Sequence, residues 1–362
     1  MPNDVRLADL GWTDDRAQRF AALAGPDLVP GRVALEHNHV FRVLTADGEV
    51  LAEVAGALKH RAAARTDLPV VGDWVGVRLD PTGARSQIRL VLPRSTRVSR
   101  KAAGRDTVEQ VVAANIDTLF VVFGLDKPVN PRAIERYLVV ARHSGAEAVV
   151  LLNKCDLVPD AAAHVRGVGP HTDGTPVLAV SSKSGEGLDR VEGWLGRGRT
   201  IALIGPSGVG KSSIVNRLIG REVLPTGEVR EWDRRGRHTS VHRQLVLREQ
   251  GGVVIDTPGM REVALWDIEA IDDAFTEIAE AAASCRFRDC RHQTEPGCAV
   301  KTAVEAGRID AARYDSYIKL RTEQDAIEQK REERGLIDAK RQSKTHARAF
   351  RALLRDRERQ RR

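Results

Sequence analysis

The stretch that decides the fold is GPSGVGKS, residues 205–212, which directly follows the apolar run Ile201–Ile204. It fits the pattern G-x-x-x-x-G-K-[ST] of a phosphate-binding loop, which joins a buried strand to a helix. Its glycines let backbone N–H groups wrap phosphates, Lys211 reaches the β- and γ-phosphates, and Ser212 ligates Mg²⁺. With glycine at about 7% of residues, a chance match in such a chain is on the order of 1%. The residues predicted to hold the phosphates are Gly205, Pro206, Ser207, Gly208, Val209, Gly210, Lys211, Ser212 and Ser213.

A second loop, Asn153-Lys154-Cys155-Asp156, follows the apolar run 149–152 and has the form N-K-x-D. The Asp156 carboxylate can accept hydrogen bonds from both N1–H and the 2-amino group of guanine, a pair that adenine does not offer. A site with such an acceptor rejects the wrong base by roughly 10⁴-fold, because the carboxylate would lose its partners. Asn153 is expected to tie this loop to the phosphate-binding loop, and the Lys154 stem to cover one face of the base. Alone the pattern is weak, but together with the phosphate-binding loop it predicts a preference for GTP.

Two further segments complete the set, and the order of all four is unusual. Ser181, Ser182 and Lys183 are predicted to supply backbone donors to the guanine O6, and Asp256-Thr257-Pro258-Gly259 follows the apolar run 252–255. In an ordinary GTPase the phosphate-binding loop comes first and the base-reading loops come last. Here the base-reading loops precede it, as in a circularly permuted domain, which is tolerated when the old termini lie close together.

The Asp256–Gly259 element is predicted to sense the terminal phosphate. Asp256 would hold Mg²⁺ through water, and the Gly259 N–H would contact the γ-phosphate. Many GTPases place a water-orienting Gln directly after this Gly, whereas this chain has Met260, so slow intrinsic hydrolysis is expected. The segment 236–240 is the candidate first switch, in which Thr239 or Ser240 could ligate Mg²⁺ and His238 could position water. The predicted catalytic residues are therefore His238, Lys211 and Thr239; an exposed His238 without a catalytic role is the alternative.

Three of the four cysteines cluster beside a histidine in the pattern C-x₄-C-x-H-x₅-C, at Cys285, Cys290, His292 and Cys298. In a reducing compartment this composition favours one tetrahedral Cys₃His zinc over disulfides. Four protein ligands leave no position for water, so a structural zinc is predicted rather than a catalytic one. Free core thiols are the alternative. Arginines between the ligands would make the cluster a candidate RNA contact.

The rest of the chain predicts a multidomain α/β protein. Short strands with Gly and Pro turns between residues 31 and 95 favour a small barrel of the OB type, and a generic barrel without ligand is the alternative. Apolar runs alternating with helical stretches from residue 110 favour a mostly parallel sheet. The predicted parts are a lead-in (1–30), an OB-fold RNA-binding domain (31–108), a circularly permuted P-loop GTPase domain (109–264), a helical zinc-binding domain (265–335) and a basic tail (336–362).

Charge and hydropathy indicate whether the chain binds nucleic acid or spans a membrane. The formal net charge is +7. From Lys340 to the end, ten Lys/Arg stand against two acids, a surplus of eight, which leaves 7 − 8 = −1 for the rest. Such a tail either binds nucleic acid or is a solvated arm. Aromatic residues make up 4% of the chain, which favours phosphate contacts over base stacking. No apolar run approaches the ~20 residues of a membrane span, and a cytoplasmic protein is expected.

Taken together, these residues resemble the bacterial small-subunit-dependent GTPases of the RsgA or YjeQ family. The resemblance covers about residues 31–330 and includes Val71–Val75 and Ala114–Asp117, besides the permuted motifs and the Cys/His cluster. It implies a monomeric cytoplasmic enzyme that assists late maturation of the 30S subunit, with GTP hydrolysis stimulated by that subunit. It also implies contacts with 16S rRNA and a catalytic role for the histidine of Arg237-His238-Thr239. The family often has consecutive threonines where this chain has Thr239-Ser240.

Two other function classes stay open from the residues alone. One is an RNA-binding chaperone for which the nucleotide is only a structural ligand, which Met260 would permit. The other is a P-loop kinase acting on a metabolite, against which Asp156 and Asn153 argue, and which a preference for ATP would favour.

Overall fold

The structure is a computed structural model that describes residues 6–82, 85–101, 109–221, 244–256 and 275–322, together with Asp325 and Gln329. The predicted site residues His238, Thr239 and Gly259 lie outside the described residues, as does the basic tail. The chain forms two compact units. Unit 1 comprises Met1–Lys101 and Glu109–Glu280, and unit 2 comprises Ala102–Val108 and Ala281–Arg362.

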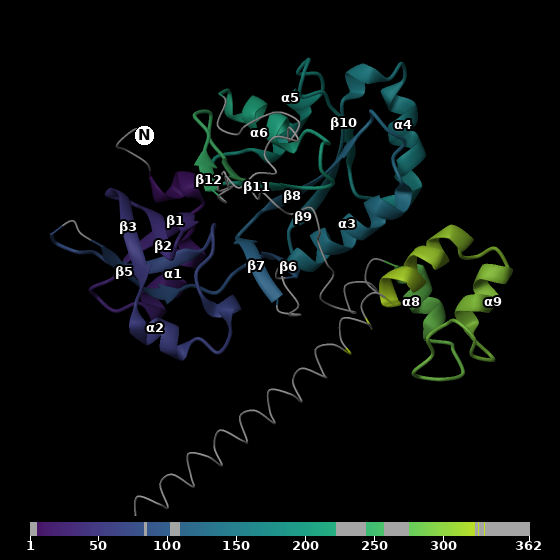
Figure 1. Ribbon diagram of the computed structural model, residues 1–362, viewed down its shortest axis with the longest axis horizontal. Helices are drawn as coiled ribbons and strands as arrows, with labels where there is room; N and C mark the ends of the chain where they lie inside the picture. Colours follow the sequence, from purple (N-terminus) through teal and green to yellow (C-terminus); the bar gives the residue numbers. More distant parts are fainter. Residues whose placement is uncertain are drawn as a thin grey trace, which may run out of the picture. The chain divides into compact units, whose positions relative to one another are not determined.

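Five strands close a small barrel in unit 1, drawn in purple and blue in Figure 1. They are β1 (Val29–His37), β2 (Val40–Thr45), β3 (Gly48–Val54), β4 (Trp74–Arg78) and β5 (Ser86–Val91). Their order is β1-β2-β3-β5-β4, and β4 pairs back onto β1. Helix α2 (Gly56–Arg61) and the short helix η2 (Arg65–Asp67) lie between β3 and β4. Alternate residues of the strands fill the interior, including Val33, Val43, Val75 and Ile88. The predicted N-terminal β-barrel is confirmed.

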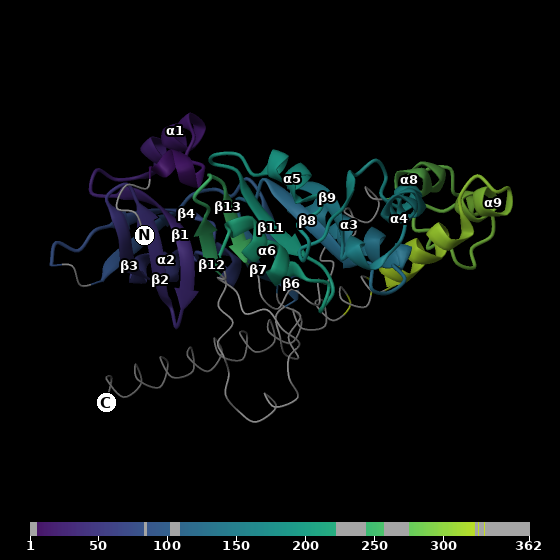
Figure 2. The same ribbon diagram turned by 90° about the horizontal axis from the view of Figure 1, so that it is seen from above.

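A second group of strands forms a mostly parallel sheet, in teal and green in Figures 1 and 2. Parallel strands β8 (Thr118–Gly124), β9 (Glu147–Asn153), β10 (Val177–Ala179), β11 (Thr200–Ile204) and β13 (Val253–Asp256) take the order β10-β9-β8-β11-β13. Strand β12 (Gln244–Leu247) pairs antiparallel with β13. The predicted parallel sheet is therefore present, with one antiparallel strand added at the β13 side.

Helices cover both faces of this sheet because successive residues of a strand point to opposite sides. Phe120 and Val122 of β8 pack in one cluster with α5 (Leu188–Val191) and α6 (Lys211–Ile219). Phe123 instead contacts Tyr137 of α3 (Pro131–Ser144) edge to face, with 5.7 Å between ring centroids. The other helices that the structure describes around this sheet are α4 (Ala161–Val168) and the short helices η3 (Cys155–Leu157), η4 (Gly169–His171) and η5 (Glu192–Trp194).

The barrel and the parallel sheet are joined by backbone pairing, since β1 also pairs with β12 at Leu35 and Gln244. The hairpin of β6 (Arg97–Lys101) and β7 (Glu109–Ala114) lies between the two in the chain. The lead-in, with η1 (Leu7–Leu10) and α1 (Asp14–Leu23), also contacts both parts. Trp12 packs against Trp74 of the barrel, and Asp9 forms an ion pair with Arg197, just before β11.

Arg32 of β1 lies at the centre of this junction and is 1% exposed. Its guanidinium donates to the Thr200 hydroxyl (2.8 Å) and to the Asn115 carbonyl (2.9 Å). It also donates to the carbonyls of Gly72 and Leu10. Burial lowers the pKa of Arg32 to about 9, which still leaves the side chain protonated at neutral pH. One buried cation thus joins the lead-in, the barrel and the first residue of β11.

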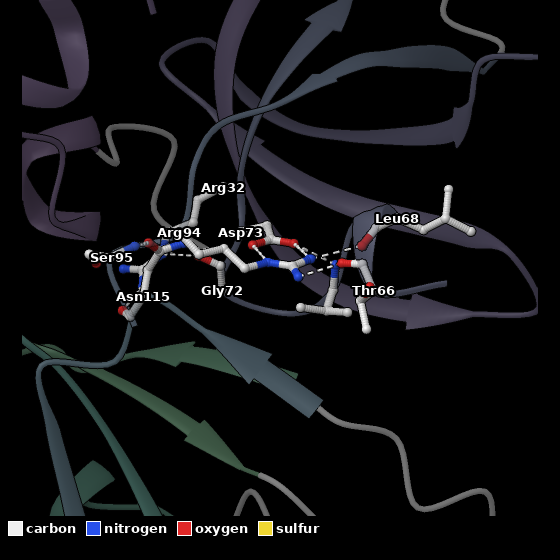
Figure 3. Close-up of polar contacts among 9 residues, drawn as sticks. Arg32, Thr66, Leu68, Gly72, Asp73, Arg94, Ser95 and Asn115 are labelled. Carbon is white, nitrogen blue, oxygen red and sulfur yellow. Dashed lines mark hydrogen bonds and ion pairs between the residues drawn. The ribbon is translucent and has the colours of Figure 1, made fainter. Parts of the chain in front are cut away.

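A buried ion pair supports the same junction, as Figure 3 shows. Arg94 donates to both oxygens of Asp73 at 2.7 and 2.8 Å and to the carbonyls of Thr66 and Leu68. Beside it, Gly72 has φ +92°, and an added Cβ would lie 2.2 Å from the Ala114 carbonyl oxygen. Only glycine allows this close approach of the two backbones. The segments 71–75 and 114–117, which carried part of the resemblance, therefore meet here.

Unit 2 contains the Cys/His cluster, α9 (Ala299–Glu305) and a helix over residues 311–322. Helix α8 (Thr276–Ala282) precedes the cluster in the chain. Among the described residues, no helix has both the length and the apolar composition needed to cross a bilayer.

Candidate nucleotide-binding and metal sites

The loops that carry the predicted nucleotide residues emerge from one edge of the parallel sheet. Strands β8, β9, β10, β11 and β13 run in the same direction, so their carboxyl ends lie together. Residues 153–156 continue from the end of β9, residues 181–183 follow β10, and residues 205–212 follow β11. Ligands of open α/β sheets bind at this edge. The permuted order in the chain therefore does not separate the loops in space.

The phosphate-binding loop is tightly packed against the base-reading loop. Gly210 has φ +94°, and a Cβ added there would lie 2.3 Å from Asn153 Nδ2, so only glycine fits. Gly210 is also the N-cap of α6 and offers no side chain to the first N–H groups of that helix. Such N–H groups, with the positive end of the helix dipole, favour an anion. Lys211 Nζ donates to the carbonyls of Gly205 (2.7 Å) and Pro206 (2.6 Å), which places its ammonium over the loop.

Asn153 is fully buried and connects three loops. Its Nδ2 donates to the Val209 carbonyl (2.8 Å) and to Ser182 Oγ (3.3 Å), while its Oδ1 accepts from the Ser182 N–H (3.0 Å). One amide thereby holds the phosphate-binding loop and the 181–183 loop in fixed relation. This is the tie that the sequence predicted for Asn153.

Lys154 has the left-handed backbone conformation (φ +67°), and its side chain bridges two other loops. Its Nζ lies 2.8 Å from the Gly208 carbonyl oxygen and 2.8 Å from Asp126 Oδ2. Sequence reasoning missed Asp126. Its position directly after the strand 118–124, at the same edge as the predicted loops, was the signal that could have found it.

Asp156 is exposed at this edge, and its Oδ1 accepts from the Ser181 hydroxyl (2.6 Å). Among the 181–183 backbone donors, Ser181 N–H donates to the Glu186 carbonyl and Ser182 N–H to Asn153. Within the described part of the chain, the exposed Lys183 has an N–H without a hydrogen-bond acceptor.

Cys155 is the buried member of the base-reading loop. Burial, with the nearby Glu186 carboxylate, raises the pKa of its thiol to about 11, so the thiol is neutral at physiological pH. The side chain therefore packs as a small apolar group, and the backbone of Cys155 serves the loop by donating to the Val180 carbonyl (3.1 Å).

The Mg²⁺ candidates lie at the same edge. Ser212 and Ser213 are partly buried in the first turn of α6, and Asp256 is the last residue of β13. Because β13 pairs with β11 in parallel, Asp256 lies on the strand next to the one that leads into the phosphate-binding loop. An alcohol and a carboxylate are hard oxygen ligands of the kind Mg²⁺ prefers.

The Cys/His cluster in unit 2 has the geometry of a four-ligand metal site. The ligand atoms of Cys285, Cys290, His292 and Cys298 all lie within 4.8 Å of one another. His292 Nδ1 is 3.5 Å from the sulfurs of Cys285 and Cys298, and those sulfurs are 3.9 Å apart. A tetrahedron with Zn–S of about 2.3 Å has edges of about 3.8 Å, so these donors fit zinc. His292 is further fixed by the Tyr314 hydroxyl, which donates to its carbonyl.

A parallel sheet with these loops in this order defines the class: a circularly permuted P-loop GTPase joined to an N-terminal barrel. The sequence model of the RsgA GTPase family matches residues 91–266. The chain is 46% identical over 330 residues to the "Small ribosomal subunit biogenesis GTPase RsgA" of Opitutus terrae, covering 88% of this chain and 90% of that protein. It is 40% identical over 348 residues to the protein of the same name from Streptomyces coelicolor, covering 94% and 93%. The chain belongs to the RsgA GTPase family, and it is a GTP hydrolase.

The solved structures agree with this assignment. YjeQ from Thermotoga maritima superposes with a TM-score of 0.61 at 29% identity, covering 82% of this chain and 98% of that one. A model named ABC transporter also matches residues 188–347, a range that includes the phosphate-binding loop. That range does not contain Asn153–Asp156, so it does not describe the base-reading part of the site. Family membership excludes the metabolite kinase that the residues alone left open.

Proposed function

We propose that this GTPase assists the late maturation of the small (30S) ribosomal subunit. In this proposal it binds 16S rRNA as a cytoplasmic monomer, and the subunit stimulates its hydrolysis of GTP to GDP and phosphate. The observation that carries the proposal is the convergence of residues 153–156, 181–183 and 205–212 at one edge of the sheet, in a chain whose relatives are named small ribosomal subunit biogenesis GTPases.

Guanine recognition is assigned to the loops that Asn153 ties together. Asp156 accepts from N1–H and the 2-amino group, and Ser181 orients that carboxylate through its hydroxyl. Lys183, with Ser181 and Ser182 shaping the loop, offers its backbone N–H to O6. The Lys154 stem covers one face of the base, and Cys155 packs beneath the loop. Adenine would leave the Asp156 carboxylate without its two donors, which is the physical basis of selectivity for guanine.

Phosphate binding and hydrolysis are assigned to residues around α6. The backbone of 205–210 surrounds the phosphates, and Lys211 neutralises charge that develops on the β- and γ-oxygens. Ser212 and Asp256 would hold Mg²⁺, which neutralises phosphate charge when bound. Gly259 is proposed to contact the γ-phosphate, Thr239 to complete the metal site, and His238 to orient the attacking water. These three residues lie outside the described part of the chain.

Cationic surfaces support the proposed contact with rRNA. On the barrel, Lys59, His60, Arg61 and Arg65 are exposed, and among the described ion pairs none involves them. In unit 2, Arg286, Arg288 and Arg291 are exposed between the proposed zinc ligands. One structural zinc there would fix the loop that carries these arginines. Phosphate contacts of this kind give salt-dependent binding with little sequence reading.

The proposal is tested by steady-state GTP hydrolysis with and without purified 30S subunits, together with sedimentation of the protein on subunits. We expect at least tenfold stimulation by 30S, and co-sedimentation with a non-hydrolysable GTP analogue that is lost with GDP. A protein that binds GTP but shows neither stimulation nor nucleotide-dependent sedimentation would contradict the ribosomal role. His238→Ala with normal GTP affinity and full stimulated turnover would remove His238 from the mechanism.

A further inference from the structure

The ammonium of Lys154 is held by two loops besides its own. Its Nζ contacts the Gly208 carbonyl oxygen of the phosphate-binding loop and the Asp126 carboxylate of the loop after β8, each at 2.8 Å. The Lys154 side chain is 26% exposed and that of Asp126 is 33% exposed. A lysine stem is flexible, and holding its ammonium at two fixed points removes most of that freedom.

The Asp126 carboxylate is itself in a fixed position, because its loop is anchored to β9. Gly124 pairs with Asn153 at the end of the two strands, and the Leu125 N–H donates to the Asn153 carbonyl at 2.8 Å. The hydrogen bond from Lys154 lowers the pKa of the Asp126 carboxyl, so this group is ionised at neutral pH. A charged acceptor on a short, anchored loop therefore faces the one cation of the base-reading loop.

We propose that Asp126 is a positioning residue for guanine binding, which holds the Lys154 stem across the base before the nucleotide arrives. This inference rests on the proposed role of residues 153–156 in reading guanine. Asp126 acts through Lys154, while Asp156 makes the contacts that select the base. Because the lysine is ordered in advance, its conformational entropy is not lost again when the base binds.

The size of the effect follows from the geometry. Loss of a partly exposed ion pair with one good hydrogen bond changes the equilibrium constant of the process that depends on it, here nucleotide binding, by a factor of about 3 to 10. Asp126→Asn keeps the size of the side chain and removes the charge. We therefore expect GDP to dissociate about 3 to 10 times faster from this variant. The change should be equal for GDP and GTP, because the stem lies against the base and not against the γ-phosphate.

The experiment measures dissociation of fluorescent GDP and GTP analogues from the full chain and its variants, with thermal melting as a check of folding. Lys154→Met removes the ammonium but keeps an apolar stem of similar length. If Asp126 acts through the ammonium, Asp126→Asn has no further effect in the Lys154→Met background. Asp173→Asn is the matched control, since Asp173 Oδ2 also lies 2.8 Å from a cation, Arg142 Nη2, but outside the nucleotide loops.

The outcomes separate this inference from the proposed function. Faster dissociation with Asp126→Asn, no change with Asp173→Asn and non-additivity with Lys154→Met support the inference. Provided that Lys154→Met itself weakens binding, three results overturn the inference. These are unchanged dissociation with Asp126→Asn, an additive effect in the double variant, and an effect confined to GTP. A wild-type protein that fails to bind guanine nucleotides, or a Lys154→Met variant that binds like the wild type, instead contradicts the assignment of residues 153–156.

Discussion

Replacing Arg32 by methionine should destabilise unit 1 strongly, although Arg32 is far from the proposed chemistry in sequence. The variant keeps the apolar stem and removes all four donated hydrogen bonds. Two of the four acceptors contribute little to the loss, because the Gly72 carbonyl still accepts from Asn115 Nδ2 and the Thr200 hydroxyl can rotate. The Leu10 and Asn115 carbonyls each lose the Arg32 donor in a buried site.

The magnitude comes from those two carbonyls. A buried acceptor left without a donor costs about 1–3 kcal/mol, and hydrogen bonds from a charged donor lie at the upper end. Removing a buried charge recovers part of its desolvation penalty, which offsets some of this loss. We expect the free energy of unfolding to fall by about 3 kcal/mol, and the melting temperature to fall by roughly 6–12 °C.

Urea unfolding followed by tryptophan fluorescence measures this change, since the Arg32 guanidinium lies 5.3 Å from the Trp74 ring centroid. Arg89→Met is the control, because Arg89 is 37% exposed and its ion pair with Asp27 spans 3.6 Å, so a change within about 0.5 kcal/mol is expected. Arg32→Lys should lie between the two, since an ammonium cannot reach acceptors on opposite sides as a guanidinium does. An Arg32→Met protein within about 1 kcal/mol of the wild type would show that the junction does not depend on this cation.

Three further predictions concern the sites. Asp156→Asn should weaken GDP binding by at least about 100-fold. The same variant should bind xanthosine diphosphate with close to wild-type GDP affinity, because xanthine offers a carbonyl where guanine has its 2-amino group. Competition with fluorescent GDP measures both affinities. Metal analysis should find one zinc per chain in the wild type and in Cys155→Ala, and none in Cys298→Ser, whose GDP affinity should be unchanged. Equal zinc contents in the wild type and both variants would contradict the Cys₃His site. Stability should fall as pH rises from 9 to 11, because the folded protein keeps the Cys155 proton that the unfolded chain releases above pH 9.0. Chemical unfolding of wild type and Cys155→Ala across that range tests it, and identical slopes would refute it.

The nucleotide loops could be predicted because each is a short run whose chemistry is complete in the sequence. A phosphate-binding loop needs its glycines and Lys211 at fixed spacing, and the apolar run before it marks a buried strand. The Cys/His cluster is equally local, with all four donors inside fourteen residues, 285–298. The β-barrel and the parallel sheet followed from turn residues and apolar runs. The domain boundaries and the individual site roles stay predictions.

The junction could not be predicted, because its partners are distant in the chain. Arg32 and Thr200 are 168 residues apart, and an isolated arginine in a strand normally indicates a solvent-facing position. Val33 faces the barrel interior, so Arg32 beside it points outward from the barrel, and only the closure of unit 1 buries it. Strand β12 was missed for a related reason. Its four residues are too few to show a period, and it is ordered by pairing with β13 and β1.

The permuted chain order keeps the site because the site depends on the order of strands in space. In the sheet, β11 lies between β8 and β13, so the phosphate-binding loop has the base-reading loops on one side and Asp256 on the other. Cutting the chain before β8 and rejoining it elsewhere changes none of these neighbours. The β1–β12–β13 pairing connects the barrel to the strand that ends at Asp256. Gln244 pairs with Leu35 of the barrel on one side and with Asp256 on the other, so a single residue separates the barrel from a proposed Mg²⁺ ligand.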